Sequence, residues 1–172
     1  MATSKLKHWL IFALGGAFLV FLDLWFKQWA AANVTSRQPV VLIPGILGLT
    51  FLENTGAAFG FLASAQQGRI FLTIASALLM AAILWYYNNI PEGKKYWLVR
   101  VPVILVFAGG LGNLIDRIAL GHVRDMLEFL FIRFPIFNLA DVFITTGTFS
   151  FVFFGLFVVK DIPLFNGKID NA

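Results

Sequence analysis

The chain has 172 residues, of which 59% are hydrophobic and only 13% charged, and its mean hydropathy is +0.83. This composition excludes a soluble globular domain and indicates an integral membrane protein. There is no cysteine, which excludes disulfides, thiol nucleophiles and thiolate metal sites, and the two histidines, His8 and His122, lie far apart. We therefore expect no metal and no cofactor. The net charge of +4 comes from basic residues that flank apolar runs, which indicates topology signals rather than a nucleic-acid partner.

Four apolar runs approach the length of about 20 residues that crosses the hydrocarbon core of a bilayer. They cover roughly residues 9–32, 70–88, 98–118 and 139–159. The first run resembles a secretory signal peptide, but it is too long for one and is interrupted by Asp23 and Lys27. We predict an all-α integral membrane protein with four transmembrane helices, in one domain spanning residues 1–172.

An even number of crossings places both chain ends on one side of the membrane. Basic residues accumulate on the cytoplasmic side of membrane proteins. The side of the chain ends carries seven of them: Lys5, Lys7, Lys94, Lys95, Arg100, Lys160 and Lys168. The opposite side carries four: Arg37, Arg69, Arg124 and Arg133. We therefore predict cytoplasmic termini and outward-facing loops around Asn54, Asp125 and Asp141.

The outer segment at 39–62 is too long for a plain connector and too apolar for a solvated loop. Side chains alternate along residues 46–51 with the period of a strand, and the Pro-Gly pair at 44–45 supplies a turn. We predict a small extracytoplasmic β-structure here. The loop at 124–135 is rich in Phe and Leu, and we expect it to dip into the membrane interface.

Several charged residues have structural interpretations. Asp23 and Lys27 lie four residues apart on one helix face, where an ion pair neutralises both charges. We assign them a supporting role. Glu53, Asp116 and Glu128 are assigned to solvated surface or interfacial positions, because charged side chains are seldom buried.

Small residues fill the sequence AGGLGN at 108–113. A nucleotide-binding loop is excluded because no strand precedes it. Ala108 and Gly112 have the spacing that allows helices to pack closely in membranes. Asn113 and Arg117 follow on one helix face, and Arg117 is placed to meet the last helix carbonyls or a substrate carbonyl.

Two carboxylates border one hydrophilic loop. Asp125 ends the sequence VRD at 123–125, and Asp141 ends FNLAD at 137–141. Two carboxylates brought together can share one proton and activate water, so the pair points to an aspartyl protease at a membrane surface. The plainer interpretations are a solvated loop acid for Asp125 and an ordinary first-turn acid for Asp141.

Ordered motifs over all four spans resemble those of lipoprotein signal peptidases, the bacterial signal peptidase II family. The motifs are Asp23 with Lys27, NTGAAF at 54–59, GNLIDR at 112–117, VRD at 123–125 and FNLAD at 137–141. The resemblance implies a multi-pass aspartyl endopeptidase of the bacterial inner membrane. Its substrates would be prolipoproteins that carry a diacylglyceryl cysteine, and it would cut before that cysteine.

The same resemblance places the catalytic pair on Asp125 and Asp141. It places the substrate site on Asn54, Gly56, Asn113, Arg117 and Asn138. The expected partners are prolipoproteins and membrane lipids, and we expect a monomer with its active site near the periplasmic face. The family usually has an apolar residue before its first catalytic Asp and Phe after it. Arg124 and Met126 stand there in this chain, which bears on loop packing.

Two other functions remain open from the residues alone. A serine protease would need a Ser-Lys pair, for which Ser36 or Ser64 with Lys27 are the candidates. A small transporter or proton channel would also carry charged residues inside its helices. Transporters place their sites near the midplane, however, whereas the polar groups here gather near one face.

Overall fold

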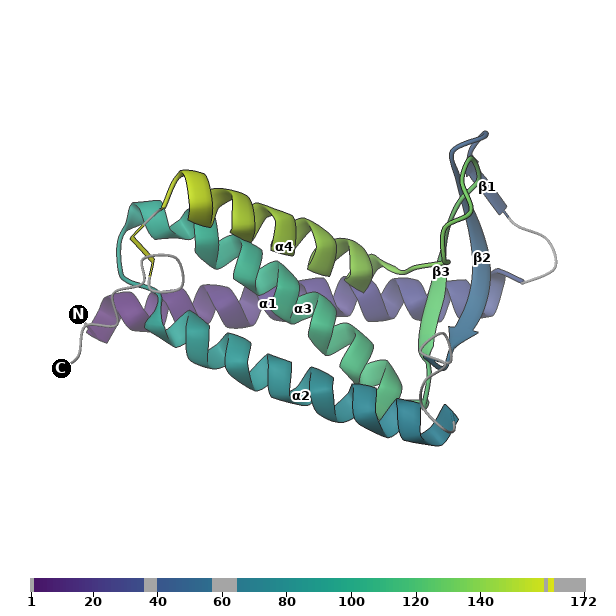
Figure 1. The fold of residues 1–172 in the computed structure, drawn as a ribbon, viewed down its shortest axis with the longest axis horizontal. Helices are drawn as coiled ribbons and strands as arrows, with labels where there is room; N and C mark the ends of the chain where they lie inside the picture. The colour runs from purple at the N-terminus through teal and green to yellow at the C-terminus, as the bar shows by residue number, and fades with distance from the viewer. Residues whose placement is uncertain (1, 36–39, 57–64, 160, 163–172) are drawn as a thin grey trace.

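Figure 1 shows a computed structural model of the chain, which describes residues 2–35, 40–56, 65–159 and 161–162. The described residues form four long helices and a small sheet at one end of them. The helices are α1 (Ala2–Asn33), α2 (Ala65–Asn89), α3 (Trp97–Ala119) and α4 (Leu139–Phe157). All four are long and apolar enough to cross a membrane, which confirms the prediction of four spanning helices.

Helix α1 begins earlier than its apolar run. We expected a start near residue 9, but the helix already includes Lys5 and Lys7, because polar residues extend a helix readily once it leaves the lipid. With 32 residues, α1 is about 48 Å long, against a hydrocarbon core of about 30 Å. Its last turns therefore reach past the other helices to the sheet (Figure 1).

The sheet has three antiparallel strands in the order β1-β2-β3, and β3 comprises Val123–Phe129. The strands β1 (Val40–Ile43) and β2 (Leu47–Asn54) form a hairpin whose turn contains Pro44 and Gly45, as predicted, and Gly45 adopts a φ of 70°. The β-structure predicted at 39–62 is confirmed for residues 40–54. Residues 39 and 57–62 lie outside the described part of the chain.

The prediction of a loop at 124–135 is wrong for its first part. Residues Val123–Phe129 form strand β3, which pairs with β2. A strand was hard to predict because Asp125 and Met126 are consecutive and both buried, so the simple alternation of faces is lost beside the irregular register between Leu49 and Leu52. Beyond β3, the exposed side chains of Leu130, Phe131, Ile132 and Phe134 leave an apolar tip.

Glycines set the close packing of α3 against α4. A side chain at Gly109 would overlap the backbone carbonyl of Ala140, and one at Gly147 would lie 2.8 Å from the carbonyl oxygen of Pro102. Ala108 and Gly112 are also buried, which confirms that this stretch of α3 is a packing surface. The close approach brings the start of α4 against the last turns of α3.

The end of the helix bundle opposite the sheet is held by aromatic packing. Phe12 of α1 packs on Tyr87 of α2, with ring centroids 4.4 Å apart, and on Phe107 of α3 at 4.8 Å. The buried residues around them include Tyr96, Val99 and Val103. Apolar burial therefore stabilises this end.

Candidate active site

Asp125 lies in strand β3, next to the last residues of β2. It is 2% exposed. Its Oδ2 accepts a hydrogen bond of 2.8 Å from Nδ2 of Asn54, and Oδ1 of Asn54 accepts one of 2.9 Å from the backbone amide of Gly56. Gly56 has a φ of 78°, a conformation that favours glycine. The hairpin therefore fixes one side of the Asp125 carboxylate.

The chain returns along β3 before it enters α4. The backbone amides of Met126 and Leu127 both donate to the carbonyl of Phe137, at 2.9 and 2.7 Å. This pairing places the next residue, Asn138, beside Asp125. Nδ2 of Asn138 donates to Oδ1 of Asp125 at 2.7 Å.

Asn138 and Asp141 cap helix α4 reciprocally. Oδ1 of Asn138 accepts from the Asp141 amide at 2.9 Å, and Oδ2 of Asp141 accepts from the Asn138 amide at 3.1 Å. A helix N-terminus stabilises an acid in its first turn. Asp141 is thus a first-turn acid, as the plainer interpretation held. The same Asn138 side chain also contacts Asp125, so the cap joins the two carboxylates.

Asn113 on α3 completes the contacts of Asp141. Its Nδ2 donates to Oδ1 of Asp141 at 2.8 Å, and its Oδ1 accepts from Asn138 at 3.1 Å and from Nζ of Lys27 at 2.8 Å. The sequence predicted Asn113 at the site. It gave no sign of the bond from Lys27, since 86 positions separate the two residues.

The ion pair predicted between Asp23 and Lys27 is confirmed, with a distance of 2.7 Å and both side chains fully buried. The pair also makes a contact that was not predicted. Oδ1 of Asp23 accepts a 2.9 Å hydrogen bond from the amide of Ala140, in the first turn of α4. Gly112 makes room for this contact, because a side chain there would overlap the Asp23 carboxylate. The pair therefore ties α1 to both helices of the site.

The interpretation of Asp116 as a solvated acid is wrong. It is 1% exposed, and its carboxylate lies 2.7 Å from Nη2 of Arg124 and 3.6 Å from Nζ of Lys27. Arg124 covers it from β3 and also donates to Oε1 of Gln28 at 3.0 Å. Arg124, which stands where an apolar residue is usual, thus supplies the cation that allows Asp116 to be buried.

Three other residues singled out in the sequence are Met126, Glu53 and Glu128. Met126 is fully buried against Ala30, Val34 and Leu49, where α1 meets the sheet. Glu53 is 62% exposed, as predicted. Glu128 is half-buried, and its Oε2 accepts a 2.6 Å hydrogen bond from Thr50, so solvation alone does not explain it.

Arg117 lies on the last turn of α3 and is half-buried. Its charge interacts with those of Asp141 and Asp125. Within the described part of the chain it donates no hydrogen bond, so the predicted contact with the last helix carbonyls is not formed. Its guanidinium therefore lies beside the two acids with no acceptor among the described residues.

A cavity of 450 Å³ opens beside the two acids. Its polar lining comes from Asn54, Asp125 and Asp141, with Thr145 and Thr146 further along α4. The rest of its wall is apolar: Phe129, Phe134, Pro135, Ile136, Phe137 and Val142. A site with few polar groups in an apolar wall suits a ligand that is itself largely apolar.

Burial shifts the acid-base properties of Asp125. It raises the pKa of the Asp125 carboxyl to about 6, and the charge of Asp141 acts in the same direction. The hydrogen bonds from Asn54 and Asn138 oppose this shift. The Asp125 carboxyl can therefore hold a proton at pH values up to about 6.

The serine alternative finds no support in the geometry of Lys27. This side chain is fully buried and bound to Asp23 and Asn113, so it has no free position as a general base. Ser36 and Ser64 lie outside the described residues. The polar side chains gather at the sheet end of the helices, away from the middle of the spans where a transporter site is expected.

Known proteins resemble this chain in sequence. The family model described as signal peptidase (SPase) II matches residues 16–157. A lipoprotein signal peptidase of Streptococcus thermophilus (strain CNRZ 1066) is 43% identical over 129 residues, which are 75% of this chain and 81% of that protein. One of Latilactobacillus sakei subsp. sakei (strain 23K) is 38% identical over 138 residues, 80% of this chain and 88% of that protein.

Solved structures show the same fold. A bacterial membrane enzyme determined by the in meso method at 1.9 Å resolution matches with a TM-score of 0.75 and 29% identity, over 86% of this chain and 92% of that one. A second such structure, at 2.3 Å resolution, matches with a TM-score of 0.72 and 28% identity, over 94% and 93% of the two chains.

Proposed function

We propose that Asp125 and Asp141 are the catalytic pair of this chain, which belongs to the signal peptidase II family of lipoprotein signal peptidases. The known role of the family is to cleave the signal peptides of prolipoproteins, so this chain is a membrane-embedded protease. The observation that carries the proposal is the side chain of Asn138. Its Nδ2 donates a hydrogen bond of 2.7 Å to Asp125, and its Oδ1 accepts one of 2.9 Å from the backbone amide of Asp141. Asn138 therefore holds both acids at one cavity.

In the proposed mechanism the pair holds one proton. The ionised carboxylate takes a proton from a water molecule, whose oxygen then bonds to the carbonyl carbon of the peptide bond. The protonated acid, which we assign to Asp125, hydrogen-bonds the carbonyl oxygen as negative charge develops there. The tetrahedral intermediate breaks its C–N bond, and the leaving amine takes a proton from the pair. The aspartates end in their starting state.

Neighbouring residues support this assignment by what they do to charge. Asn113 donates to one oxygen of Asp141, and Asn138 donates to one oxygen of Asp125. These hydrogen bonds restrain the carboxylates without neutralising them. The charge of Arg117 interacts with the charges of Asp125 and Asp141, but its guanidinium donates no hydrogen bond within the described residues. We propose that it binds a substrate carbonyl. An Arg there would orient the peptide and stabilise developing negative charge.

Asn54 and Gly56 form the other wall of the proposed substrate site. Nδ2 of Asn54 donates to Asp125, while its Oδ1 holds the Gly56 amide. We propose that the substrate runs past this corner of β2 toward the acids. The apolar cavity wall, which includes Phe129 and Phe134, would contact the substrate beside the diacylglyceryl cysteine, whose acyl chains remain in the bilayer.

The site test is substitution of each acid by asparagine, which keeps the size but cannot exchange a proton. Asp125→Asn and Asp141→Asn are each expected to abolish cleavage of a synthetic prolipoprotein that carries diacylglycerol. The double variant should be no worse than either single one, because the acids act as a unit. Cleavage is read on a gel, and thermal unfolding in detergent verifies folding. Substantial turnover by either single variant contradicts the aspartyl pair.

We also propose that the chain is a monomer of the bacterial inner membrane with cytoplasmic termini, so that the sheet and the acids face the periplasm. The absence of native cysteine makes the topology easy to test. Leu120→Cys, near the sheet end of α3, should react with an impermeant thiol reagent in intact spheroplasts. Glu92→Cys, between α2 and α3 at the other end, should react only after lysis. The reverse pattern would overturn the orientation.

A further inference from the structure

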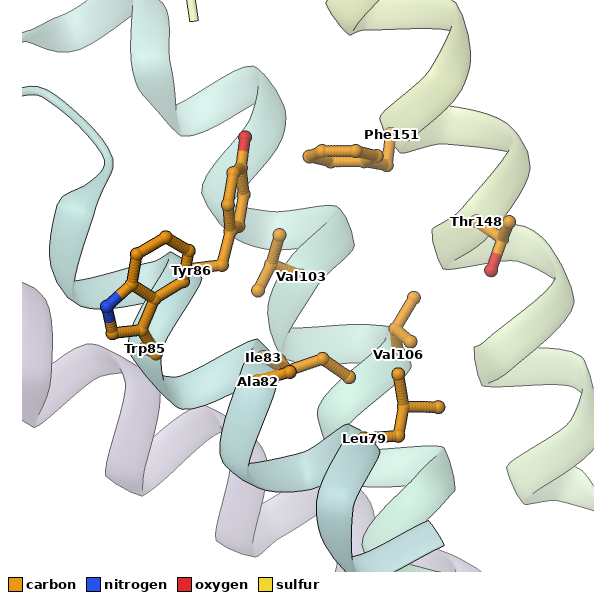
Figure 2. A pocket seen from close by; sticks show the side chains of 9 residues that line it. All are labelled: Leu79, Ala82, Ile83, Trp85, Tyr86, Val103, Val106, Thr148 and Phe151. Atoms are coloured by element: carbon orange, nitrogen blue, oxygen red, sulfur yellow. The ribbon is translucent and has the colours of Figure 1, made fainter. Parts of the chain in front are cut away.

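Helices α2 and α4 both pack on α3 and leave an apolar groove between them. It has a volume of 340 Å³. In Figure 2, side chains of α2 such as Leu79 and Ala82 line one side, Val103 and Val106 of α3 lie at the base, and Thr148 comes from α4. Leu79 is 54% exposed, so nothing within the described chain covers this side of the groove.

The far end of the groove is closed by an aromatic contact. The rings of Tyr86 on α2 and Phe151 on α4 meet edge to face, with centroids 5.5 Å apart (Figure 2). This contact joins the two helices at the end away from the sheet. Toward the sheet, the described residues form no such aromatic bridge between α2 and α4, and the groove leads in the direction of the acids.

The groove and the catalytic cavity share one flank of α4. Asp141, Thr145 and Thr148 are spaced i, i+4 and i+7, so they lie along one face of the helix. Asp141 and Thr145 line the cavity, and Thr148 lines the groove. Phe151 follows Asp141 by ten residues, which is about 15 Å along the helix axis. The groove therefore lies further along the same face of α4 than the catalytic cavity.

Polar atoms along this flank and in the groove lack hydrogen-bond partners within the described residues. Thr145 and Thr148 are exposed, and within the described residues their hydroxyls form no hydrogen bond. The Tyr86 hydroxyl is buried without a partner. An acyl chain cannot use these groups. A peptide can, because the segment next to a bond that is being cut is not helical, and its free N–H and C=O groups need partners inside a membrane.

We propose that the α2–α4 groove binds the apolar helix of the substrate's signal peptide and that Thr145 and Thr148 hydrogen-bond the extended residues between this helix and the scissile bond. The inference rests on the proposed catalytic pair and orientation. The signal peptide precedes the scissile bond, so it must run from the acids back through the membrane. The groove supplies an apolar surface along that path.

The first test fills the groove. Ala82 is exposed and lines it, whereas the neighbouring Ala81 is also exposed but does not line it. Ala82→Trp should raise KM about tenfold for a diacylglyceryl prolipoprotein with its whole signal peptide. It should leave KM unchanged for a short lipopeptide that has only the residues around the scissile bond. Ala81→Trp, the matched control, should change neither value.

Equal effects of Ala82→Trp on the two substrates, or no effect on either, would overturn the groove assignment. The second result is the one expected if a membrane phospholipid occupies the groove. Because this test compares two substrates that the same acids cut, it can fail while Asp125 and Asp141 remain essential. Loss of the proposed catalytic pair would instead appear as activity in the asparagine variants with both substrates.

Cross-linking gives a second test that does not depend on rates. In the inactive Asp125→Asn background, Ala82→Cys should form a bismaleimide cross-link with a single cysteine placed about ten residues before the scissile bond, at the depth of the groove. The diacylglyceryl cysteine of the substrate is a thioether and does not react. Ala81→Cys should cross-link far less. Equal cross-linking of both variants, or none, would contradict the proposal.

Discussion

The two ends of the helix bundle each bury a cation, but they balance its charge in different ways. At the sheet end, Nζ of Lys27 lies 2.7 Å from Asp23 and 3.6 Å from Asp116. At the opposite end, Arg100 is 4% exposed and has no carboxylate partner within the described residues. It donates 2.8 Å to the carbonyl of Ile90, and its guanidinium lies 4.9 Å from the ring centre of Tyr87.

The difference shows how to interpret a charge buried in a spanning helix. Arg100 donates to carbonyls at and just past the end of α2, where the helix dipole favours a cation, so it holds a turn in place. Lys27 instead reaches a polar side chain, Asn113, that contacts Asp141. Through Asn113, Lys27 connects to one of the two acids of the candidate site. The identity of the acceptors, rather than burial, separates the structural cation from the one at the site.

The largest expected effect in this comparison comes from Lys27→Ala. It leaves Asp23 buried without its cation, which costs about 3–5 kcal/mol of folding free energy. The yield of folded protein in detergent, measured by size exclusion and thermal unfolding, should fall more than the turnover of the protein that remains folded. Lys95→Ala, which removes an exposed partner of Asp161, is the control and should leave both unchanged.

The double variant Asp23→Leu with Lys27→Met sharpens this prediction. Removing both charges together leaves no unpaired ion, so it should recover stability relative to Lys27→Ala. A Lys27→Ala protein that folds as well as the wild type but is inactive would contradict a supporting role and move Lys27 into the catalytic machinery.

A smaller effect is expected from Arg100→Lys. A lysine ammonium lacks the planar fork of donors with which the guanidinium binds these carbonyls. The variant should therefore lose about 1–2 kcal/mol of stability. The kcat of the folded protein should stay unchanged, because none of the contacts of Arg100 among the described residues is with the polar site. A drop in kcat with unchanged thermal stability would contradict a purely structural role for Arg100.

Much of the fold follows from the sequence, because length and apolarity decide which segments span a membrane. The four helices were predicted close to their observed ranges, and the hairpin at 40–54 followed from its alternation and its Pro-Gly turn. Strand β3 was missed because it contains three charged residues and is paired with a strand about 75 positions away, so no local pattern reveals it.

The candidate site could be predicted only in part. Asp125 and Asp141 were found because each stands at a border of one loop, and Asn113 and Asn138 followed from the family motifs. The burial of Asp116 and the bond from Lys27 to Asn113 were not foreseeable, since both depend on contacts between helices. Long-range polar contacts leave no periodicity in a sequence, whereas apolar faces do.

The pH dependence of stability distinguishes Asp125 from the supporting charges. Its pKa is raised to about 6 in the folded protein, above the usual value of 3.8. Folding therefore disfavours its charged form, and the stability that the neutral acid contributes is lost as the pH rises from about 4 through about 6. Asp125→Asn should consequently unfold at a higher temperature than the wild type at pH 8, with the gap closing toward pH 4.

The most direct test of the catalytic pair is the pH profile of kcat/KM for wild type and Asn54→Ala, measured on lipidated substrate. If Asp125 is the protonated member, activity falls as the pH rises through the upper pKa of the pair, near 6. Asn54 donates to the charged form of Asp125, so its removal raises that pKa and should move the alkaline limb to higher pH. An alkaline limb that stays in place, or moves to lower pH, would contradict Asp125 as the acid.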